Sequence, residues 1–227
     1  MVFADRRDAG QRLAVELLRF KNQAPVVLAL PRGGVPVGFE IATRLEAPLD
    51  VVLVRKIGHP LSPELAVGAV ADGDRPERFI DESAVAGLDV PRAYLDAEIN
   101  RQLHEIEHRH DLYFKDRQPV DIREHTAIVV DDGIATGATM RAALRATRRR
   151  SPATLVLAVP VAPASVLAAL RSEVDEIVCL SSQEDFGAVG LFYADFGQVE
   201  DDVVIDLLDR AAARVRPPHP TSPRTAD

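Results

Sequence analysis

An apolar run that leads directly into two carboxylates is the feature that most constrains the fold of this chain. Residues 127–130 are all apolar, Asp131 and Asp132 follow at once, and a helical pattern begins at Met140. This order is typical of a buried β-strand, a tight turn and the N-terminus of a helix. Because the first backbone N–H groups of a helix are unpaired, such a turn favours a bound anion.

The residue types within this turn indicate a phosphorylated sugar as the ligand. Gly137 has no Cβ to block a close approach, and Thr136 and Thr139 offer hydroxyl donors. Two carboxylates repel a phosphate, so Asp131 and Asp132 suit sugar hydroxyls or a cation that accompanies the phosphate. An ordinary capped turn needs fewer of these groups. The stretch lacks the Lys of a P-loop and the G-x-G-x-x-G spacing of a dinucleotide-binding turn.

The turn resembles the signature of the type I phosphoribosyltransferases, in which two acidic residues precede a small-residue loop ending in Thr-Gly-x-Thr or Thr-Gly-x-Ser. The resemblance covers roughly Phe3 to Arg210 and includes residues 31–34, 56–58, 63–70 and 192–196. It implies an α/β protein with the type I phosphoribosyltransferase fold. In this fold, helices cover both faces of a central, mostly parallel sheet, and a small hood recognises the base.

Strands that alternate with helices independently indicate a parallel sheet. The runs with the length and composition of buried strands are residues 26–30, 50–54, 127–130, 154–159 and 176–180. Right-handed crossovers bring the carboxyl ends of such strands to one edge. We expect one domain over residues 1–213, with part of the hood at about 181–200. A disordered Pro-rich tail is expected over residues 214–227.

Besides the helix expected from Met140, five further helical patterns accompany the strands. They are a helix capped by Asp5 and helices over about 35–45, 91–115, 164–171 and 202–213. The long pattern at 91–115 carries His104 and His108 one turn apart. This spacing suits a metal, but a solvated pair is favoured because no third ligand is evident nearby.

Composition narrows the class of protein. The net charge of −8 argues against a nucleic-acid partner, whose binding domain would carry a basic face. The single cysteine excludes an intrachain disulfide and is typical of a reducing compartment, so we expect a cytoplasmic protein. Charged residues near the N-terminus argue against a signal peptide, and three prolines break the longest uncharged stretch, residues 151–170. No membrane association is expected.

Two further loops carry groups for an anion. Arg32, Gly33 and Gly34 lie between an expected strand and an expected helix, where the resemblance implies a pyrophosphate-binding loop. Arg55 and Lys56 follow the next strand, and with residues 57–60 they are predicted to form a mobile loop that closes over anionic groups. A solvated basic turn is the plainer interpretation of this second loop.

The aromatic residues of segment 186–196 admit two interpretations. Phe192, Tyr193 and Phe196 can belong to the core or can stack on a flat base, and the residues alone favour neither. The resemblance makes all three candidates for base binding in the hood.

The resemblance also implies a reaction: transfer of the 5-phosphoribosyl group of phosphoribosyl pyrophosphate (PRPP) to a nitrogen nucleophile, usually a nucleobase, with release of pyrophosphate. Catalytic roles are implied for Asp131, Asp132, Lys56 and Arg55. Mg²⁺ is the implied cofactor, held by Asp131 and Asp132 directly or through water. The residues implied to bind the 5-phosphate are Gly133, Ala135, Thr136, Gly137, Ala138 and Thr139. A homodimer is the usual assembly in the family.

Other functions stay open at this point. Some proteins that resemble this family bind PRPP or nucleotides as regulators without transferase activity. A hydrolase or lyase would need a water-activating base, for which His59 and Glu64 are the candidates. Ala135 stands where 6-oxopurine enzymes carry an Asp before Thr-Gly, so the loop is closer to the adenine type there, which does not establish adenine.

Overall fold

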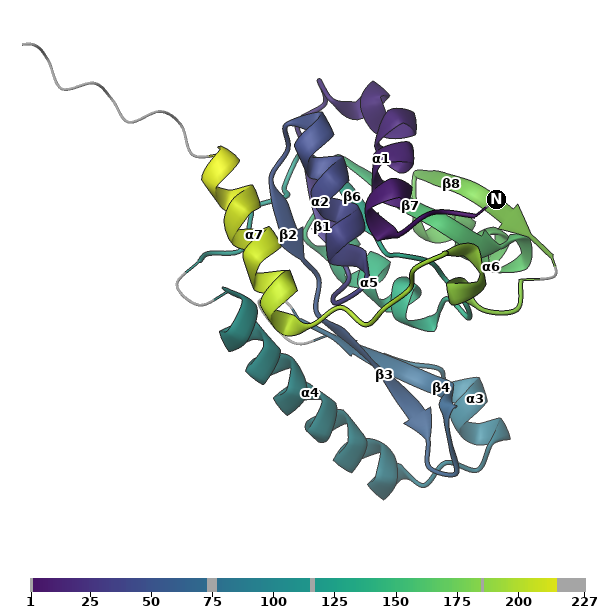
Figure 1. The fold of residues 1–227 in the computed structure, drawn as a ribbon. Helices are drawn as coiled ribbons and strands as arrows, with labels where there is room; N and C mark the ends of the chain where they lie inside the picture. Colours follow the sequence, from purple (N-terminus) through teal and green to yellow (C-terminus); the bar gives the residue numbers. More distant parts are fainter. Residues whose placement is uncertain (1, 73–76, 115–116, 185, 216–227) are drawn as a thin grey trace, which may run out of the picture.

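A five-stranded, fully parallel sheet forms the centre of the molecule, with the strand order β2-β1-β6-β7-β8 (Figure 1). The computed structural model describes residues 2–72, 77–114, 117–184 and 186–215. The sheet consists of β1 (Pro25–Ala29), β2 (Leu49–Val51), β6 (Thr126–Val130), β7 (Thr154–Pro163) and β8 (Glu176–Gln183). The strands expected at 26–30, 127–130, 154–159 and 176–180 are therefore confirmed, although β7 and β8 extend further than predicted.

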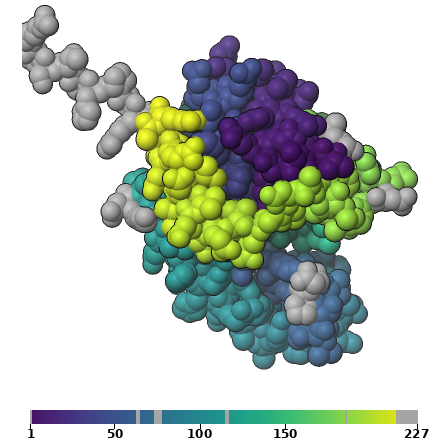
Figure 2. All heavy atoms as spheres, in the orientation of Figure 1, coloured from purple at the N-terminus to yellow at the C-terminus, as the bar shows by residue number. Residues whose placement is uncertain are grey.

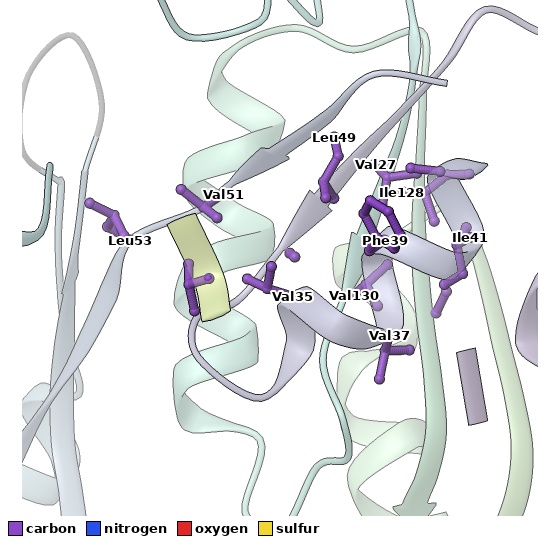
Figure 3. Packing of buried hydrophobic residues seen from close by; sticks show 14 of the residues in the cluster. Val27, Val35, Val37, Phe39, Ile41, Leu49, Val51, Leu53, Ile128 and Val130 are labelled. Atoms are coloured by element: carbon purple, nitrogen blue, oxygen red, sulfur yellow. The ribbon is translucent and has the colours of Figure 1, made fainter. Parts of the chain in front are cut away.

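Helices cover both faces of this sheet. The helices on one face are α1 (Arg6–Leu17), α2 (Gly34–Leu45) and α7 (Asp201–Val215), and those on the other are α5 (Ala138–Arg149) and α6 (Ala164–Leu170). Successive strand residues alternate between the two cores, since Val27 packs in the first and Leu28 in the second. Figure 3 shows Phe39 and Ile41 of α2 lying beside Val27 and Ile128 in the first core.

Helix α1 packs closely against α2. A Cβ added at Gly10 would lie 2.8 Å from the carbonyl oxygen of Val37, so glycine permits this close packing. Asp5 caps α1 as predicted, because its carboxylate accepts the backbone N–H of Asp8.

Residues 54–114 form a second unit, which we call the small lobe. Its strands are β3 (Val54–His59), β4 (Ser62–Ala71) and β5 (Glu77–Ile80), which pair antiparallel in that order. Its helices are α3 (Glu82–Gly87) and α4 (Arg92–Phe114), and α4 packs against β3 and β4 (Figure 1). The long helix predicted at 91–115 is thus confirmed.

The chain around the predicted mobile loop is different from the prediction. Instead of one strand at 50–54 followed by a loop, β2 ends at Val51 and the chain crosses into β3, which contains Arg55 and Lys56. Arg55 is paired with Val70 of β4. Ile57 is fully buried, so β3 has an apolar anchor and a hydrogen-bonded partner strand that make it a regular strand.

The remaining expectations concern the chain end and the exposed groups. Helix α7 continues to Val215, so the tail expected from 214 begins within a helix, and residues 216–227 lie outside the described residues.

His104 and His108 are exposed. Among the described residues, no group of three or more His, Cys, Asp or Glu side chains could hold a metal ion. Across the same part of the chain, every helix is too short or too polar to cross a membrane.

Candidate active site

A cleft of about 580 Å³ separates the carboxyl edge of the parallel sheet from the small lobe. The loops after β1 and β6 and the start of α5 contribute Pro31, Asp131, residues 133–137, Thr139 and Met140. The small lobe contributes residues 54–56, Gly58, Tyr94, Glu98, Arg101 and Gln102. Predicted residues of the β6–α5 turn and of β3 therefore meet in one cavity, which is large enough for a phosphorylated sugar together with a second small molecule.

The turn between β6 and α5 is built to present backbone donors. Gly137 precedes α5 with a φ of 82°, a left-handed conformation that glycine adopts without strain. The helix start has no side-chain cap among the described residues, which leaves its first N–H groups available. Thr136 and Thr139 line the same cavity, and Ala138 is the first helical residue between them. An anion bound here would receive both backbone and hydroxyl donors.

The two adjacent carboxylates have different surroundings. Asp131 lines the cleft, and its Oδ1 accepts the backbone N–H of Asp132 at 2.8 Å. Asp132 Oδ2 accepts Arg6 Nε at 2.7 Å, and the backbone oxygen of Asp132 accepts the Tyr193 hydroxyl at 2.5 Å. Arg6 was not predicted from the sequence as a residue of the site.

Burial governs the charge of this pair. Removal from water raises the pKa of Asp131 well above its ordinary value, and the neighbouring Asp132 charge raises it further. Burial also raises the pKa of Asp132, while the hydrogen bond and charge of Arg6 oppose that shift. Arg6 thus stabilises the ionised form of Asp132, whereas Asp131 has no comparable arginine among the described residues and would gain from a cation in the cleft.

The loop after β1 packs against the acidic pair. A Cβ at Gly33 would lie 2.0 Å from Asp132 Oδ2, and one at Gly34 would lie 2.8 Å from the backbone oxygen of Val130. These glycines therefore let the two loops approach each other, a reason for glycine that the sequence did not reveal. Pro31, joined to the next residue by a cis peptide bond, is the member of this loop that lines the cleft.

The Arg32 side chain extends towards the start of α7 and does not line the cleft. Its Nη1 is 3.7 Å from both Glu200 Oε2 and Asp201 Oδ2. The predicted pyrophosphate-binding role of Arg32, Gly33 and Gly34 stays a prediction, because the guanidinium group of Arg32 contacts these protein carboxylates and the two glycines pack against the β6–α5 turn.

Four residues of α4 that were not predicted face the cleft from the small lobe. They are Tyr94, Glu98, Arg101 and Gln102. Their spacing places them on one face of a helix, a signal that the sequence contained but that the many charges of α4 obscured.

These side chains form a connected polar network with β3. Arg55 Nε donates to Gln102 Oε1 at 3.1 Å, and Gln102 Nε2 donates to Glu98 Oε1 at 2.8 Å. Arg101 Nη2 donates to the same Glu98 oxygen at 2.6 Å. Burial, followed by the charge of Arg109, lowers the pKa of Arg55. An arginine so placed still carries its proton and supplies positive charge to the cleft.

The aromatic segment divides between core and surface. Phe192 is only 6% exposed and stacks on Phe186, and Tyr193 is buried beside Phe3. Phe196 is 36% exposed and stacks on Tyr193. This burial favours the core interpretation for Phe192 and Tyr193, while Phe196 retains an exposed surface.

His59, one of the two candidate bases of a hydrolase, does not line the cleft. His59 Nε2 lies 3.3 Å from the Leu88 carbonyl oxygen, and its Nδ1 accepts the Leu61 backbone N–H. The side chain of Glu64 lies outside the described parts of the chain. The described geometry therefore gives His59 no position from which to activate water in the cavity.

Comparison with known proteins decides the family. Residues 5–196 match the phosphoribosyl transferase domain. The chain belongs to the phosphoribosyl transferase domain family. A Mycobacterium tuberculosis protein, named provisionally as a phosphoribosyl transferase in strains CDC 1551 and H37Rv, is 44% identical over 210 residues. The match covers 92% of this chain and 47% of that protein, so the chain spans about half the length of the curated relatives it matches.

A solved structure supports the same conclusion for the fold. The crystal structure of TT1426 from Thermus thermophilus shares 43% sequence identity with this phosphoribosyl transferase domain. The two superimpose with a TM-score of 0.78, and the match covers 92% of this chain and 98% of the other. The fold of this domain is therefore the type I phosphoribosyltransferase fold expected from the sequence.

Proposed function

We propose that this domain transfers the 5-phosphoribosyl group of PRPP to a nitrogen nucleophile and releases pyrophosphate. The observation that carries the proposal is the composition of the cleft of about 580 Å³. It combines an uncapped helix N-terminus beside Thr136 and Thr139, the carboxylate of Asp131, and the basic residues Arg55 and Lys56. The helix N-terminus suits a phosphate, the carboxylate suits the hydroxyls of a ribose, and the two basic residues suit a pyrophosphate.

Each part of PRPP has a proposed place. The 5-phosphate would take the backbone N–H groups and hydroxyls of residues 136–139, and the ribose hydroxyls would donate to Asp131. Pyrophosphate would lie towards Pro31, Arg55 and Lys56. In the reaction the C1′–oxygen bond to pyrophosphate breaks and a C1′–nitrogen bond forms, and the acceptor loses its proton. The protein would contribute positioning, charge complementarity and exclusion of water.

The residues at the cleft fit a magnesium cofactor. Asp131 is desolvated beside a second carboxylate, so a divalent cation would relieve an unfavourable charge. Within the described residues no cluster of three or more acidic, His or Cys ligands exists to form a protein cage. Mg²⁺ commonly takes one or two carboxylates and completes its shell with water and substrate phosphate oxygens, which suits Asp131. When bound, Mg²⁺ would neutralise the leaving pyrophosphate.

We further propose a nucleobase as the acceptor and a homodimer as the assembly. Both follow from the family resemblance. Ala135 offers no side-chain base at the position before Thr-Gly, so proton removal from the acceptor would depend on another group or on water. Sedimentation velocity would test the dimer directly.

The decisive experiment measures pyrophosphate release from PRPP with Mg²⁺ against a panel of purines, pyrimidines and simple amines. Release with a particular acceptor, lost in Asp131→Asn and kept in Asp206→Asn, would support the proposal. Asp206 is an exposed carboxylate on α7 and serves as the matched control. PRPP binding without release across the panel would favour a PRPP-binding regulator. Failure to bind PRPP at all would overturn the proposal.

A further inference from the structure

Arg6 stands at a helix position that is unfavourable for a cation, but its side chain is held by contacts with the rest of the fold. It is the first residue of α1, where the partial positive charge of the helix N-terminus disfavours a cation. Its side chain is nevertheless only 13% exposed. Burying a charged group is costly unless it is paired and hydrogen-bonded. The tertiary contacts of Arg6, rather than the stability of α1, must therefore account for its position.

The guanidinium group of Arg6 joins three parts of the chain. Its Nε donates to Asp132 Oδ2 at 2.7 Å, and its Nη1 donates to the Gly197 backbone oxygen at 2.7 Å. Its Cζ lies 3.9 Å from the centre of the Phe196 ring. Only a planar, forked cation can make these two hydrogen bonds and stack on a ring at the same time.

Main-chain hydrogen bonds hold the surrounding segments together. The Phe3 N–H donates to the Phe192 oxygen at 2.8 Å, and the Ala194 N–H donates to the Phe3 oxygen at 2.8 Å. We call residues 3–6 together with residues 192–197 the N-terminal clamp. Figure 2 shows these two segments packed side by side, the first in purple and the second in yellow-green.

The clamp holds the acidic pair through residues that do not line the cleft. Besides Arg6, it contributes the Tyr193 hydroxyl, which donates to the Asp132 backbone oxygen at 2.5 Å. The backbone and the carboxylate of Asp132 are thus both held by the clamp, while Asp131 lines the cleft. The clamp therefore fixes the direction in which the β6–α5 turn presents its carboxylates.

We propose that Arg6 is a positioning residue for substrate binding: by holding Asp132 in the clamp, it leaves Asp131 as the carboxylate that faces the ribose of PRPP. This inference rests on the proposed function. It assigns the two neighbouring carboxylates different roles, one towards the ligand and one towards the fold. It also means that PRPP binding depends on the N-terminal clamp being ordered, although the clamp lies outside the cleft.

The test compares Arg6→Lys with Arg7→Met. Lysine keeps the charge but loses the fork, whereas Arg7 is a neighbouring arginine, 73% exposed, whose Nε lies 3.2 Å from Glu40 Oε1. We expect Arg6→Lys to weaken PRPP binding by roughly 10–100-fold in titration calorimetry, as the loss of a group that orients a ligand-binding carboxylate does. We expect Arg7→Met to bind PRPP like the unaltered protein. Wild-type affinity in a folded Arg6→Lys protein would overturn the inference.

Hydrogen–deuterium exchange without any ligand gives a second readout. Arg6→Lys should accelerate backbone exchange in residues 131–134 and 192–197, while exchange in β7 and β8 stays unchanged. Unchanged exchange in both segments would contradict the clamp even if PRPP binding fell. Arg6→Met is the more severe variant, and Arg6→Lys keeps the test valid should Arg6→Met fail to fold.

The two ideas fail in different ways. If the unaltered protein does not bind PRPP, the proposed function is wrong, and the exchange experiment still decides whether Arg6 orders residues 131–134. If the unaltered protein binds PRPP and Arg6→Lys binds it equally well, the proposed function stands and the role of Arg6 is wrong.

Discussion

The carboxyl edge of the parallel sheet and the small lobe face the same cleft, but they hold their polar groups differently. At the sheet edge, short side chains and backbone groups are fixed by close contacts: Asp131 accepts a backbone N–H, and Gly33 allows the neighbouring loop to touch Asp132. In the small lobe, long side chains such as Arg55 and Gln102 hold one another.

The two sides of the cleft therefore suit different tasks: the sheet edge orients the ligand, and the small lobe responds to its charge. Groups fixed by the backbone cannot rearrange without moving the sheet, so the sheet edge suits ligand parts that must be held in one orientation. Long side chains have many rotamers and can follow a ligand whose charge moves during a reaction. The comparison predicts that changes at the sheet edge alter chemistry or folding, whereas changes in the lobe alter affinity.

The largest effect is expected from Asp131→Asn. The substitution keeps the shape of the side chain but removes its charge, so the ribose and the cation lose their carboxylate partner. We expect kcat/KM to fall by at least ~100-fold, comparable to the loss of a group that stabilises a transition state. Steady-state kinetics with PRPP varied at a saturating concentration of the acceptor would measure it. An activity within a few-fold of the unaltered protein would show that Asp131 is not the critical carboxylate.

Gly33→Ala should show how tightly the sheet edge is packed. The new methyl group would meet Asp132 Oδ2 at 2.0 Å, so the loop or the carboxylate must move. We expect the free energy of unfolding to fall by about 1–3 kcal/mol, as overpacking generally costs. Gly87→Ala is the matched control, because nothing lies within 4 Å of its added Cβ. Urea denaturation of both variants would measure the difference, and equal stability would contradict the close contact.

A smaller effect is expected from Arg55→Met in the small lobe. Loss of one charge-assisted contact should weaken PRPP binding by roughly tenfold. The midpoint of thermal unfolding should change little, because the Arg55 side chain is itself 36% exposed. Arg78→Met, an exposed arginine on β5, is the control. A large loss of stability in Arg55→Met would show that the lobe network is structural rather than adaptable.

The smallest effect concerns pH. Because the pKa of Asp131 is raised in the folded protein, folding favours its protonated form, and stability falls as pH rises from its ordinary pKa of 3.8 through the raised value. Without Mg²⁺, Asp131→Asn should therefore unfold at a higher temperature than the unaltered protein near neutral pH. This advantage should vanish below pH ~4. A difference that stays constant with pH would contradict the assigned shift.

The sequence was sufficient for the parallel sheet and for the β6–α5 turn. Apolar strands such as 127–130 and the glycine at 137 are local signals, and local signals survive in a single sequence. The grouping of Asp131, Thr136 and Thr139 with Lys56 was expected because parallel strands end at one edge, although Lys56 lies in β3 of the small lobe rather than at the end of a parallel strand.

Tertiary context decided what the sequence left open. Residues 55–60 looked like a loop because they begin with two cations and contain glycine and proline, but pairing with β4 makes 54–59 a strand. Arg6 gave no local signal, because its partner Asp132 is 126 positions away. Phe192 and Phe196 were indistinguishable in the sequence, and packing against Phe186 places the first in the core.

The bridge between Phe3 and Tyr193 has a consequence for biosynthesis. These residues lie 190 positions apart, so the first leaves the ribosome long before its partner exists. At ordinary rates of translation the interval is roughly 10–40 s. During that time the aromatic ring of Phe3, fully buried in the finished protein, has no native partner in the 192–195 segment. The surroundings of the acidic pair are therefore completed among the last steps of folding, and nascent chains that end before Tyr193 should lack them.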